Sequence, residues 1–324
     1  MITTRGLART FKTRAGLVEA VRGVDFEVAA GEIVGFLGPN GAGKTTTQRM
    51  LATLLAPTAG EATVAGADLR REPRRVRERI GYVAQGGMTN PTALVAEELV
   101  MQARLFGIPR PDAEARARRL LAELDLAGLD ARPVKTLSGG QRRRLDIALG
   151  LVHGPPLVFL DEPSTGLDPH SRANLWGHIR GLRDRDGATV FLTTHYLDEA
   201  DALCDRILVI DHGRVVAEGS PEALKRRVSG DVVTLALDGD PAAAAALLAA
   251  QPNVRAVQPV DGGVRVTVER GDAEAIALMR VLDGAGVRVA SLSVARPSLD
   301  DVFLTMTGRS LRDDAPAAAP GGAP

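Results

Sequence analysis

The chain has 324 residues, enough for one large domain and a smaller one. Its 40 basic and 40 acidic residues give a formal net charge of zero, which argues against non-specific electrostatic binding of nucleic acid. No nucleic-acid partner is therefore expected. A single cysteine, Cys204, excludes an internal disulfide and favours a reducing cytoplasm. The first residues lack the apolar core of a signal peptide, and no stretch approaches the roughly 18 consecutive apolar residues of a membrane helix, so any membrane role is expected to come through a partner.

The first part of the chain has the character of strands. Residues 5–30 predict antiparallel strands with a hairpin, in three short segments at 7–11, 18–21 and 24–28. Phe11 lies in the first of these segments, and from this stretch alone a core position in a strand is its simplest interpretation.

A glycine-rich loop follows, between a predicted buried strand at 33–37 and a predicted helix at 46–55. It matches the pattern G-x-x-x-x-G-K-[ST] at every fixed position. In such a loop the backbone N–H groups and the helix N-terminus attract a polyphosphate, Lys44 reaches its β- and γ-phosphates, and the Thr45 hydroxyl can ligate Mg²⁺. The alternative is an ordinary glycine-rich turn, which the flanking elements disfavour. The loop therefore predicts a nucleoside triphosphate site made by Gly38, Pro39, Asn40, Gly41, Ala42, Gly43, Lys44, Thr45 and Thr46.

The next segments change from strand to helix. A charged run at 70–79 predicts a solvated helix face, and a short apolar strand at 80–85 ends in Gln85, which by its position alone is typical of a solvated loop residue. Residues 91–130 are helical in character. A helical insertion between strands predicts a subdomain with a surface of its own, available for docking.

A second glycine-containing helix start lies at residues 137–141, Leu-Ser-Gly-Gly-Gln, with helical spacing continuing to 151. Ser138 is a plausible helix N-cap, and the two glycines favour another nest of backbone amides. Two phosphate-binding helix starts in one chain suggest that two copies sandwich a nucleotide, each contributing a different end. The arginine triplet at 142–144 is expected to be the solvated face of this helix.

Two further strands end in polar side chains. The buried-type strand at 157–160 is followed by Asp161 and Glu162, at the strand end where ligands bind in open α/β sheets. Beside a phosphate loop, Asp161 would hold Mg²⁺ through its waters and Glu162 would polarise the attacking water, whereas an acidic helix cap is the alternative. A strand at 189–194 ends at His195, which is either structural or a γ-phosphate contact.

The composition changes after Gly219-Ser220-Pro221, where a hairpin at 207–217 ends. The following elements have the order β-α-β-β-α-β of a ferredoxin-like motif without an obvious catalytic cluster, which predicts a small regulatory or dimerising domain. Its expected strands and helices are 232–237, 242–250, 254–260, 264–268, 273–282 and 287–294, with an amphipathic end at 299–307. The domains are expected at 1–220 and 221–309, and the Ala/Pro/Gly-rich tail at 310–324 is expected to be disordered.

Over about residues 5–220 the chain resembles the nucleotide-binding subunit of an ABC transporter, whose diagnostic signature is the sequence at 137–141. The resemblance implies a P-loop α/β ATPase with an antiparallel β subdomain, a helical subdomain at about 86–150, and the small C-terminal α+β domain. It also implies a head-to-tail homodimer that closes over two ATP–Mg²⁺ at the cytoplasmic face of the cell membrane, as a peripheral partner of an integral membrane permease subunit.

The same resemblance implies roles for individual residues. It implies that Glu162, Lys44 and His195 are catalytic, and that His195 is the switch histidine that contacts the γ-phosphate. It also implies that Thr45, Asp161 and Gln85 bind Mg²⁺. The resemblance further implies that Phe11 stacks on adenine, that Asp168 communicates across the dimer, and that the partner copy's signature contacts the nucleotide through Ser138, Gly139, Gly140 and Gln141.

Residues 193–201 and 297–304, with Thr307 and Gly308, are similar to the daunorubicin-resistance type of ATPase, which serves drug export with a separate permease. This implies export of a hydrophobic drug or antibiotic. Exporters of lipids or polysaccharides share much of this pattern and stay as the alternative. A soluble, non-transport ABC ATPase is disfavoured by the single cassette and the lack of coiled-coil or zinc insertions. A binding-only regulatory ATPase is disfavoured because the whole catalytic set is present.

Overall fold

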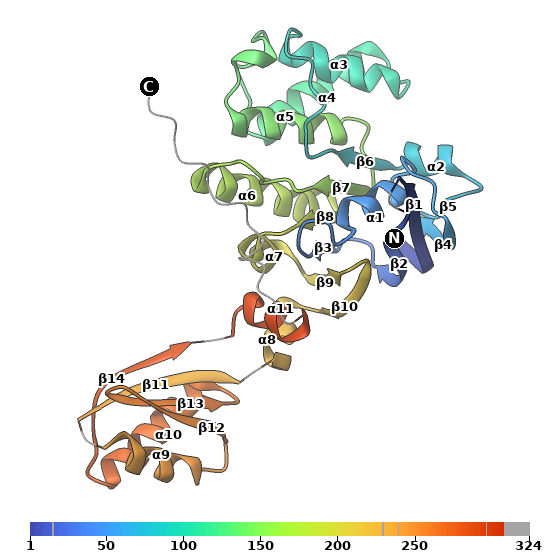
Figure 1. The fold of residues 1–324 in the computed structure, drawn as a ribbon. Helices are drawn as coiled ribbons and strands as arrows, with labels where there is room; N and C mark the ends of the chain where they lie inside the picture. Colours follow the sequence, from blue (N-terminus) through green and yellow to red (C-terminus); the bar gives the residue numbers. More distant parts are fainter. Residues whose placement is uncertain (15, 229, 239, 296, 308–324) are drawn as a thin grey trace. The chain divides into compact units, whose positions relative to one another are not determined.

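The structure is a computed structural model that describes residues 1–14, 16–228, 230–238, 240–295 and 297–307 (Figure 1). The chain divides into two compact units, Met1–Ser220 and Pro221–Pro324. The tail predicted at 310–324 lies outside the described residues.

The first unit begins with an antiparallel four-stranded sheet in the order β2-β1-β4-β5. In place of the short strands expected at 18–21 and 24–28, the chain forms one continuous strand, β2. The register between β1 and β2 shifts beside Gly23, which has a φ of +76°. This bulge breaks the alternation of apolar residues without ending the strand, so the sequence pattern suggested a turn. The strands of this sheet are β1 (Ile2–Thr13), β2 (Gly16–Val28), β4 (Ala59–Val64) and β5 (Ala67–Asp68).

A six-stranded sheet forms the centre of the first unit, in the order β10-β9-β3-β8-β7-β6. All neighbours are parallel except β10, which pairs antiparallel with β9 as the expected hairpin. Because β3, β6, β7 and β8 run in the same direction, the residues that follow them meet at one edge of the sheet. The strands are β3 (Ile33–Leu37), β6 (Ile80–Val83), β7 (Leu157–Asp161), β8 (Thr189–Thr194), β9 (Arg206–Asp211) and β10 (Arg214–Gly219).

The helices of the first unit include the predicted insertion, in which α3 and α4 pack on each other and on α5 (Figure 1). Helix α1 ends at Leu51 rather than at 55, because Thr53 leaves the helical region with a φ of +61°. The helices are α1 (Lys44–Leu51), α2 (Pro73–Glu78), α3 (Val95–Leu105), α4 (Arg110–Glu123), the 3-10 helix η1 (Val134–Thr136), α5 (Gly139–Leu151), α6 (Pro169–Asp186) and α7 (Leu197–Leu203).

An aromatic cluster joins the two sheets of the first unit. The ring of Phe26 lies 5.8 Å from the rings of both Phe36 and Phe191, and Phe159 lies 5.7 Å from Phe191. All four rings are buried, and such large apolar side chains dominate the energy of a core. The cluster fixes β3, β7 and β8 against β2, and so fixes the sheet edge to which they lead.

One buried side chain in α1 is poorly matched to its surroundings. Gln48 is 0% exposed, and neither its Oε1 nor its Nε2 has a hydrogen-bond partner among the residues that the structure describes. A buried amide without partners costs about 1–3 kcal/mol. We expect Gln48→Met, which keeps the volume, to raise the free energy of unfolding by about 1–2 kcal/mol in urea denaturation. The matched change Gln102→Met on α3 should be nearly neutral, and a destabilised Gln48→Met would contradict this view of the site.

The second unit contains the sheet β12-β13-β11-β14, in which all neighbours are antiparallel. Helices α9 and α10 pack their apolar side chains on it in one core. This arrangement confirms the predicted ferredoxin-like α+β fold. The elements are α8 (Pro221–Val228), β11 (Asp231–Asp238), α9 (Pro241–Ala249), β12 (Val254–Val260), β13 (Gly263–Val268), α10 (Gly271–Gly284), β14 (Arg288–Ala295) and α11 (Leu299–Thr307), which packs against α8.

Candidate nucleotide-binding site

The glycine-rich loop connects β3 to α1, which begins at Lys44. Gly43 has a φ of +107°, and a side chain there would lie 2.5 Å from the carbonyl oxygen of Ala20. A side chain at Gly38 would lie 2.3 Å from the carbonyl oxygen of Ile210. Only glycine satisfies both positions, so the loop closes tightly enough for its amides to converge.

Lys44 is folded into this loop. Its side chain is 4% exposed, and Nζ donates hydrogen bonds to the carbonyl oxygens of Gly38 at 2.7 Å and Pro39 at 3.0 Å. Burial lowers the pKa of Lys44, and the neighbouring carboxylates of Glu162 and Asp161 only partly oppose this. A cation held at the mouth of a loop of amides is suited to a polyphosphate.

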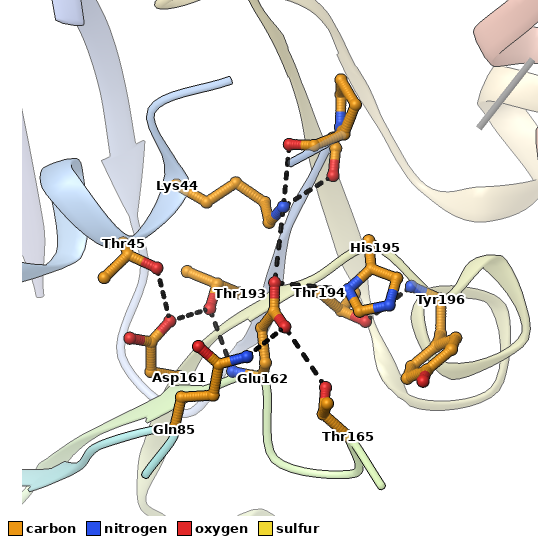
Figure 2. Close-up of polar contacts among 12 residues, drawn as sticks. Lys44, Thr45, Gln85, Asp161, Glu162, Thr165, Thr193, Thr194, His195 and Tyr196 are labelled. Carbon is orange, nitrogen blue, oxygen red and sulfur yellow. Dashed lines mark hydrogen bonds and ion pairs between the residues drawn. The ribbon is translucent and has the colours of Figure 1, made fainter. Parts of the chain in front are cut away.

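Asp161 ends β7 beside the first residues of α1 (Figure 2). Its Oδ1 accepts hydrogen bonds from the Thr45 hydroxyl at 3.0 Å and from the Thr193 hydroxyl at 2.6 Å. A hydroxyl and a carboxylate this close fit the oxygen ligands that Mg²⁺ prefers. Within the described ranges no three His, Cys, Asp or Glu side chains gather as a metal site. A Mg²⁺ held by Thr45 and Asp161 would take its other ligands from phosphate and water, as is usual for this ion.

Glu162 lies at the centre of the polar network in Figure 2 and is 7% exposed. Its Oε1 lies 3.5 Å from Lys44 Nζ and 3.2 Å from His195 Nδ1. Its Oε2 accepts hydrogen bonds from Gln85 Nε2 at 2.9 Å and from Thr165 Oγ1 at 3.2 Å. Burial raises the pKa of Glu162, but the interactions with His195, Lys44 and Thr165 outweigh it, so the pKa is lowered. The carboxylate is therefore charged at neutral pH.

Four strand ends supply these side chains: Gln85 follows β6, Asp161 ends β7 and Glu162 follows it, His195 follows β8, and the glycine-rich loop follows β3. The structure thus brings together the residues predicted for phosphate, Mg²⁺ and hydrolysis. A small cavity of about 190 Å³ lies at this edge. It is lined by Ala20, Asn40, Gly41, Gly43, Lys44, Thr45, Thr46, Gln85 and Glu162.

Other predicted residues lie away from this cavity. Phe11 on β1 pairs with Val18 on β2, and the Arg9 guanidinium lies 4.6 Å from the centre of its ring. Asp168 caps α6, where its carboxylate accepts hydrogen bonds from the backbone N–H and the hydroxyl of Ser171 at 2.9 and 2.6 Å. Neither residue lines the cavity.

The signature residues begin α5 as a capping box. The Ser138 hydroxyl accepts a hydrogen bond from the Gln141 N–H at 3.2 Å, and the Gln141 side chain accepts one from the Ser138 N–H at 3.0 Å. Ser138 is thus the predicted N-cap. Residues 138–141 do not line the phosphate-loop cavity of their own chain.

The prediction that residues 142–144 form a solvated face is wrong for Arg143. Its side chain is 7% exposed, and it donates hydrogen bonds to backbone carbonyls beside the site. Arg142 is exposed and Arg144 is half-buried. The available signal was helical spacing, which places Arg143 on the same face as the buried Ile147 and Gly150.

Sequence reasoning also missed Thr193. This buried residue of β8 donates from its hydroxyl to Asp161, and its hydroxyl and carbonyl oxygens accept the Glu162 N–H at 3.1 Å each. It therefore holds the Asp161 carboxylate and the Glu162 backbone in place. A threonine inside an apolar strand gives no local signal of such a role.

The comparisons with known proteins agree with this geometry. A family profile described as "ABC transporter" matches residues 21–165. Among solved structures, a dimeric ATP-binding cassette, MJ0796, in a post-hydrolysis state bound to ADP and Pi is 26% identical, with a TM-score of 0.63 over 68% of this chain and 98% of that one. The chain belongs to the ABC transporter family, as an ATPase of the ATP-binding cassette type.

Within this family the chain is similar to drug-resistance proteins over nearly its whole length. The C-terminal profile "ATP-binding protein DrrA1-3-like, C-terminal domain" matches residues 219–307. The daunorubicin/doxorubicin resistance ATP-binding protein DrrA of Streptomyces peucetius is 45% identical, covering 96% of this chain and 94% of its own. The doxorubicin resistance protein DrrA of Mycobacterium tuberculosis is 40% identical (94% and 93%), and the Nod factor export ATP-binding protein I of Rhizobium meliloti is 40% identical (90% and 85%). The predicted resemblance to the daunorubicin-resistance type is confirmed.

Proposed function

We propose that this chain energises a separate membrane permease that exports a hydrophobic drug or antibiotic, and that it works as a head-to-tail homodimer closing over two ATP–Mg²⁺. The observation that carries the proposal is the junction of the glycine-rich loop, Asp161 and Glu162 at one sheet edge, in a chain similar to DrrA proteins over both of its units. Each part of the site has a chemical task.

The loop and Lys44 would bind the phosphates of ATP. Thr45 and Asp161 would hold Mg²⁺, and Gln85 would lie at the edge of this Mg²⁺ site. When bound, Mg²⁺ would neutralise charge on the phosphate oxygens. Glu162 would orient and polarise the attacking water, because a carboxylate with a lowered pKa stays charged and can accept a hydrogen bond but is a weak base. His195, whose Nδ1 lies 3.2 Å from Glu162 Oε1, would contact the γ-phosphate.

The second half of each site would come from the partner copy. Helix α5 begins with the exposed residues Ser138 and Gly139, and a helix N-terminus is a position that attracts anions. Since residues 138–141 do not line their own chain's cavity, a second copy facing head to tail would bring them to the γ-phosphate, with Asp168 near the contact. Phe11 is assigned to the adenine ring, in exchange for its contact with Arg9.

A membrane partner is required by this proposal. Among the residues that the structure describes, no helix has both the length and the apolar character needed to cross a membrane. The chain would therefore act as a peripheral subunit at the cytoplasmic face of the cell membrane. ATP-driven closing and opening of the dimer would pass through the helical subdomain to the permease, which would alternate its access.

The cargo class follows from the relatives. DrrA proteins, named for daunorubicin and doxorubicin resistance, match the chain at 40–45% identity. A lipid or polysaccharide cargo is the second candidate, because Nod factor export proteins are also 38–40% identical.

Transport by membranes of the native host tests the cargo. Inverted vesicles should accumulate doxorubicin, a fluorescent probe, when ATP–Mg²⁺ is added, and vesicles from a strain carrying Glu162→Gln should not. Equal ATP-dependent accumulation in both strains would contradict the proposal. If neither strain accumulates doxorubicin while ATP hydrolysis differs between them, the drug assignment fails and the lipid or polysaccharide cargo takes its place.

A further inference from the structure

A single buried guanidinium spans three backbone segments of the candidate site. Arg143, on α5, donates from Nε to the carbonyl oxygen of Pro163 at 2.9 Å, from Nη1 to that of Ala84 at 2.6 Å, and from Nη2 to that of Asp161 at 2.9 Å. The planar fork of an arginine suits several fixed acceptors, because its donors point in set directions. All three nitrogens of the side chain are thus used on backbone carbonyls.

The three carbonyls belong to residues next to the predicted hydrolytic groups. Asp161 and Pro163 flank Glu162 on its two sides, and Ala84 precedes Gln85. Glu162 has a φ of +44°, a backbone conformation that non-glycine residues adopt only when their neighbours hold them there. Arg143 therefore holds the backbone that aims Glu162, and also the backbone that aims Gln85, whose Nε2 lies 2.9 Å from Glu162 Oε2.

Asp146, one turn further along α5, holds the other end of the same loop. Its buried carboxylate accepts the Met88 N–H at 2.9 Å. Gly87 has a φ of +77°, and a side chain there would lie 3.1 Å from Asp146 Oδ2. The Gln85 loop, residues 84–89, is thus attached to α5 at both ends by a pair of buried charged side chains.

Helix α5 also packs directly on the strand that leads into this loop. A side chain at Gly81 of β6 would lie 2.3 Å from the carbonyl oxygen of Gly150 of α5, so the two backbones are in contact. Strand β6, the Gln85 loop and α5 consequently form one packed body. The start of that body carries residues 138–141, which the proposed function assigns to the partner's nucleotide.

We propose that Arg143 is a positioning residue for ATP hydrolysis, which keeps Glu162 and Gln85 aligned with each other and with the signature helix α5. The inference rests on the proposed function, because it concerns the same site. It adds a mechanical link within one chain. Helix α5, which would contact the nucleotide of the partner copy, is hydrogen-bonded through Arg143 to the backbone on both sides of Glu162. Arg143 touches neither ATP nor water in this scheme, and it acts through Glu162 and Gln85.

The test measures steady-state phosphate release by the purified full-length chain. Arg143→Gln is shorter, neutral and donates from one nitrogen, so it cannot reach three carbonyls. We expect the kcat to fall at least about tenfold while the KM for ATP stays within about threefold, the pattern of a lost alignment rather than lost binding. Arg143→Lys keeps the charge without the fork and should give an intermediate kcat. The matched control Arg118→Gln, at an exposed position of α4, should leave both constants unchanged.

A Tm measurement accompanies each variant. The proposal is overturned if folded Arg143→Gln or Arg143→Lys has a kcat within twofold of the wild type. It is also overturned if kcat and ATP binding fall together in step with the Tm, since that pattern marks a general loss of structure. Should Arg143→Gln fail to fold, Arg143→Lys decides the matter by the same criteria. A wild-type chain that hydrolyses no ATP, neither purified nor in membranes of its native host, would instead refute the proposed function, so the two failures are distinguishable.

Discussion

Replacing Glu162 with glutamine is expected to lower ATP turnover at least about 100-fold while ATP binding persists. Glutamine keeps the shape of the side chain and can still meet Gln85 and Thr165, but it has no charge with which to polarise water. It also ends the ion pair with Lys44, whose Nζ lies 3.5 Å from Glu162 Oε1. Glu162 then no longer competes with the phosphates for Lys44, so the affinity for ATP should be equal or higher.

Phosphate release and equilibrium binding of a fluorescent ATP analogue measure the two quantities separately. Glu78→Gln is the matched control, because it makes the same change on an exposed carboxylate of α2 and should leave both unchanged. Turnover by Glu162→Gln near the wild-type rate would remove Glu162 from its assigned role. Loss of ATP binding would instead assign the side chain to the phosphate pocket.

Replacing Ser138 with arginine is expected to abolish ATP-dependent dimerisation. Ser138 is an exposed N-cap at the start of α5, and in the proposed dimer it faces the partner's γ-phosphate. A long cationic side chain there would fill the space between the two halves of the site. The effect is measured by light scattering after gel filtration, in the Glu162→Gln background so that ATP is not consumed.

Two controls separate this effect from others. Ser138→Ala removes the capping hydroxyl, at a cost of about 1 kcal/mol, without adding bulk. Ala122→Arg adds the same charge on the exposed side of α4. Both should still dimerise with ATP. An ATP-dependent dimer of Ser138→Arg would refute a site built from two copies.

The parts of the site that sequence could predict are those made by contiguous residues. A glycine-rich loop, a strand ending in two carboxylates and a capped helix start each carry a local pattern with a physical reason. Their meeting at one sheet edge followed from the expectation of parallel strands, and the register of β3, β7 and β8 confirms that expectation. The C-terminal fold was predictable in the same way, from alternating strand and helix patterns.

The parts that could not be predicted depend on contacts between distant segments. Arg143 looked like one of three surface arginines, because nothing in its own helix shows that carbonyls of residues 84, 161 and 163 converge on it. Thr193 likewise gains its role from Asp161 across a strand pair. Gln48 gives no sign in its sequence context that its amide faces the core. The sequence pattern predicts a break near Gly23 for a related reason: only the pairing with β1 keeps β2 continuous there.

Whether this chain drives a membrane permease can be determined by capture of its partners from the native host. Tagged Glu162→Gln protein, held in its ATP-bound form, would be extracted gently in detergent with ATP–Mg²⁺ and its partners identified by mass spectrometry. The same capture with Ser138→Arg added serves as the control for dimer-dependent partners. We expect a polytopic membrane protein in stoichiometric amount. Ribosomal proteins, nucleic acid or a soluble scaffold, with no membrane protein, would contradict it and leave a soluble ATPase.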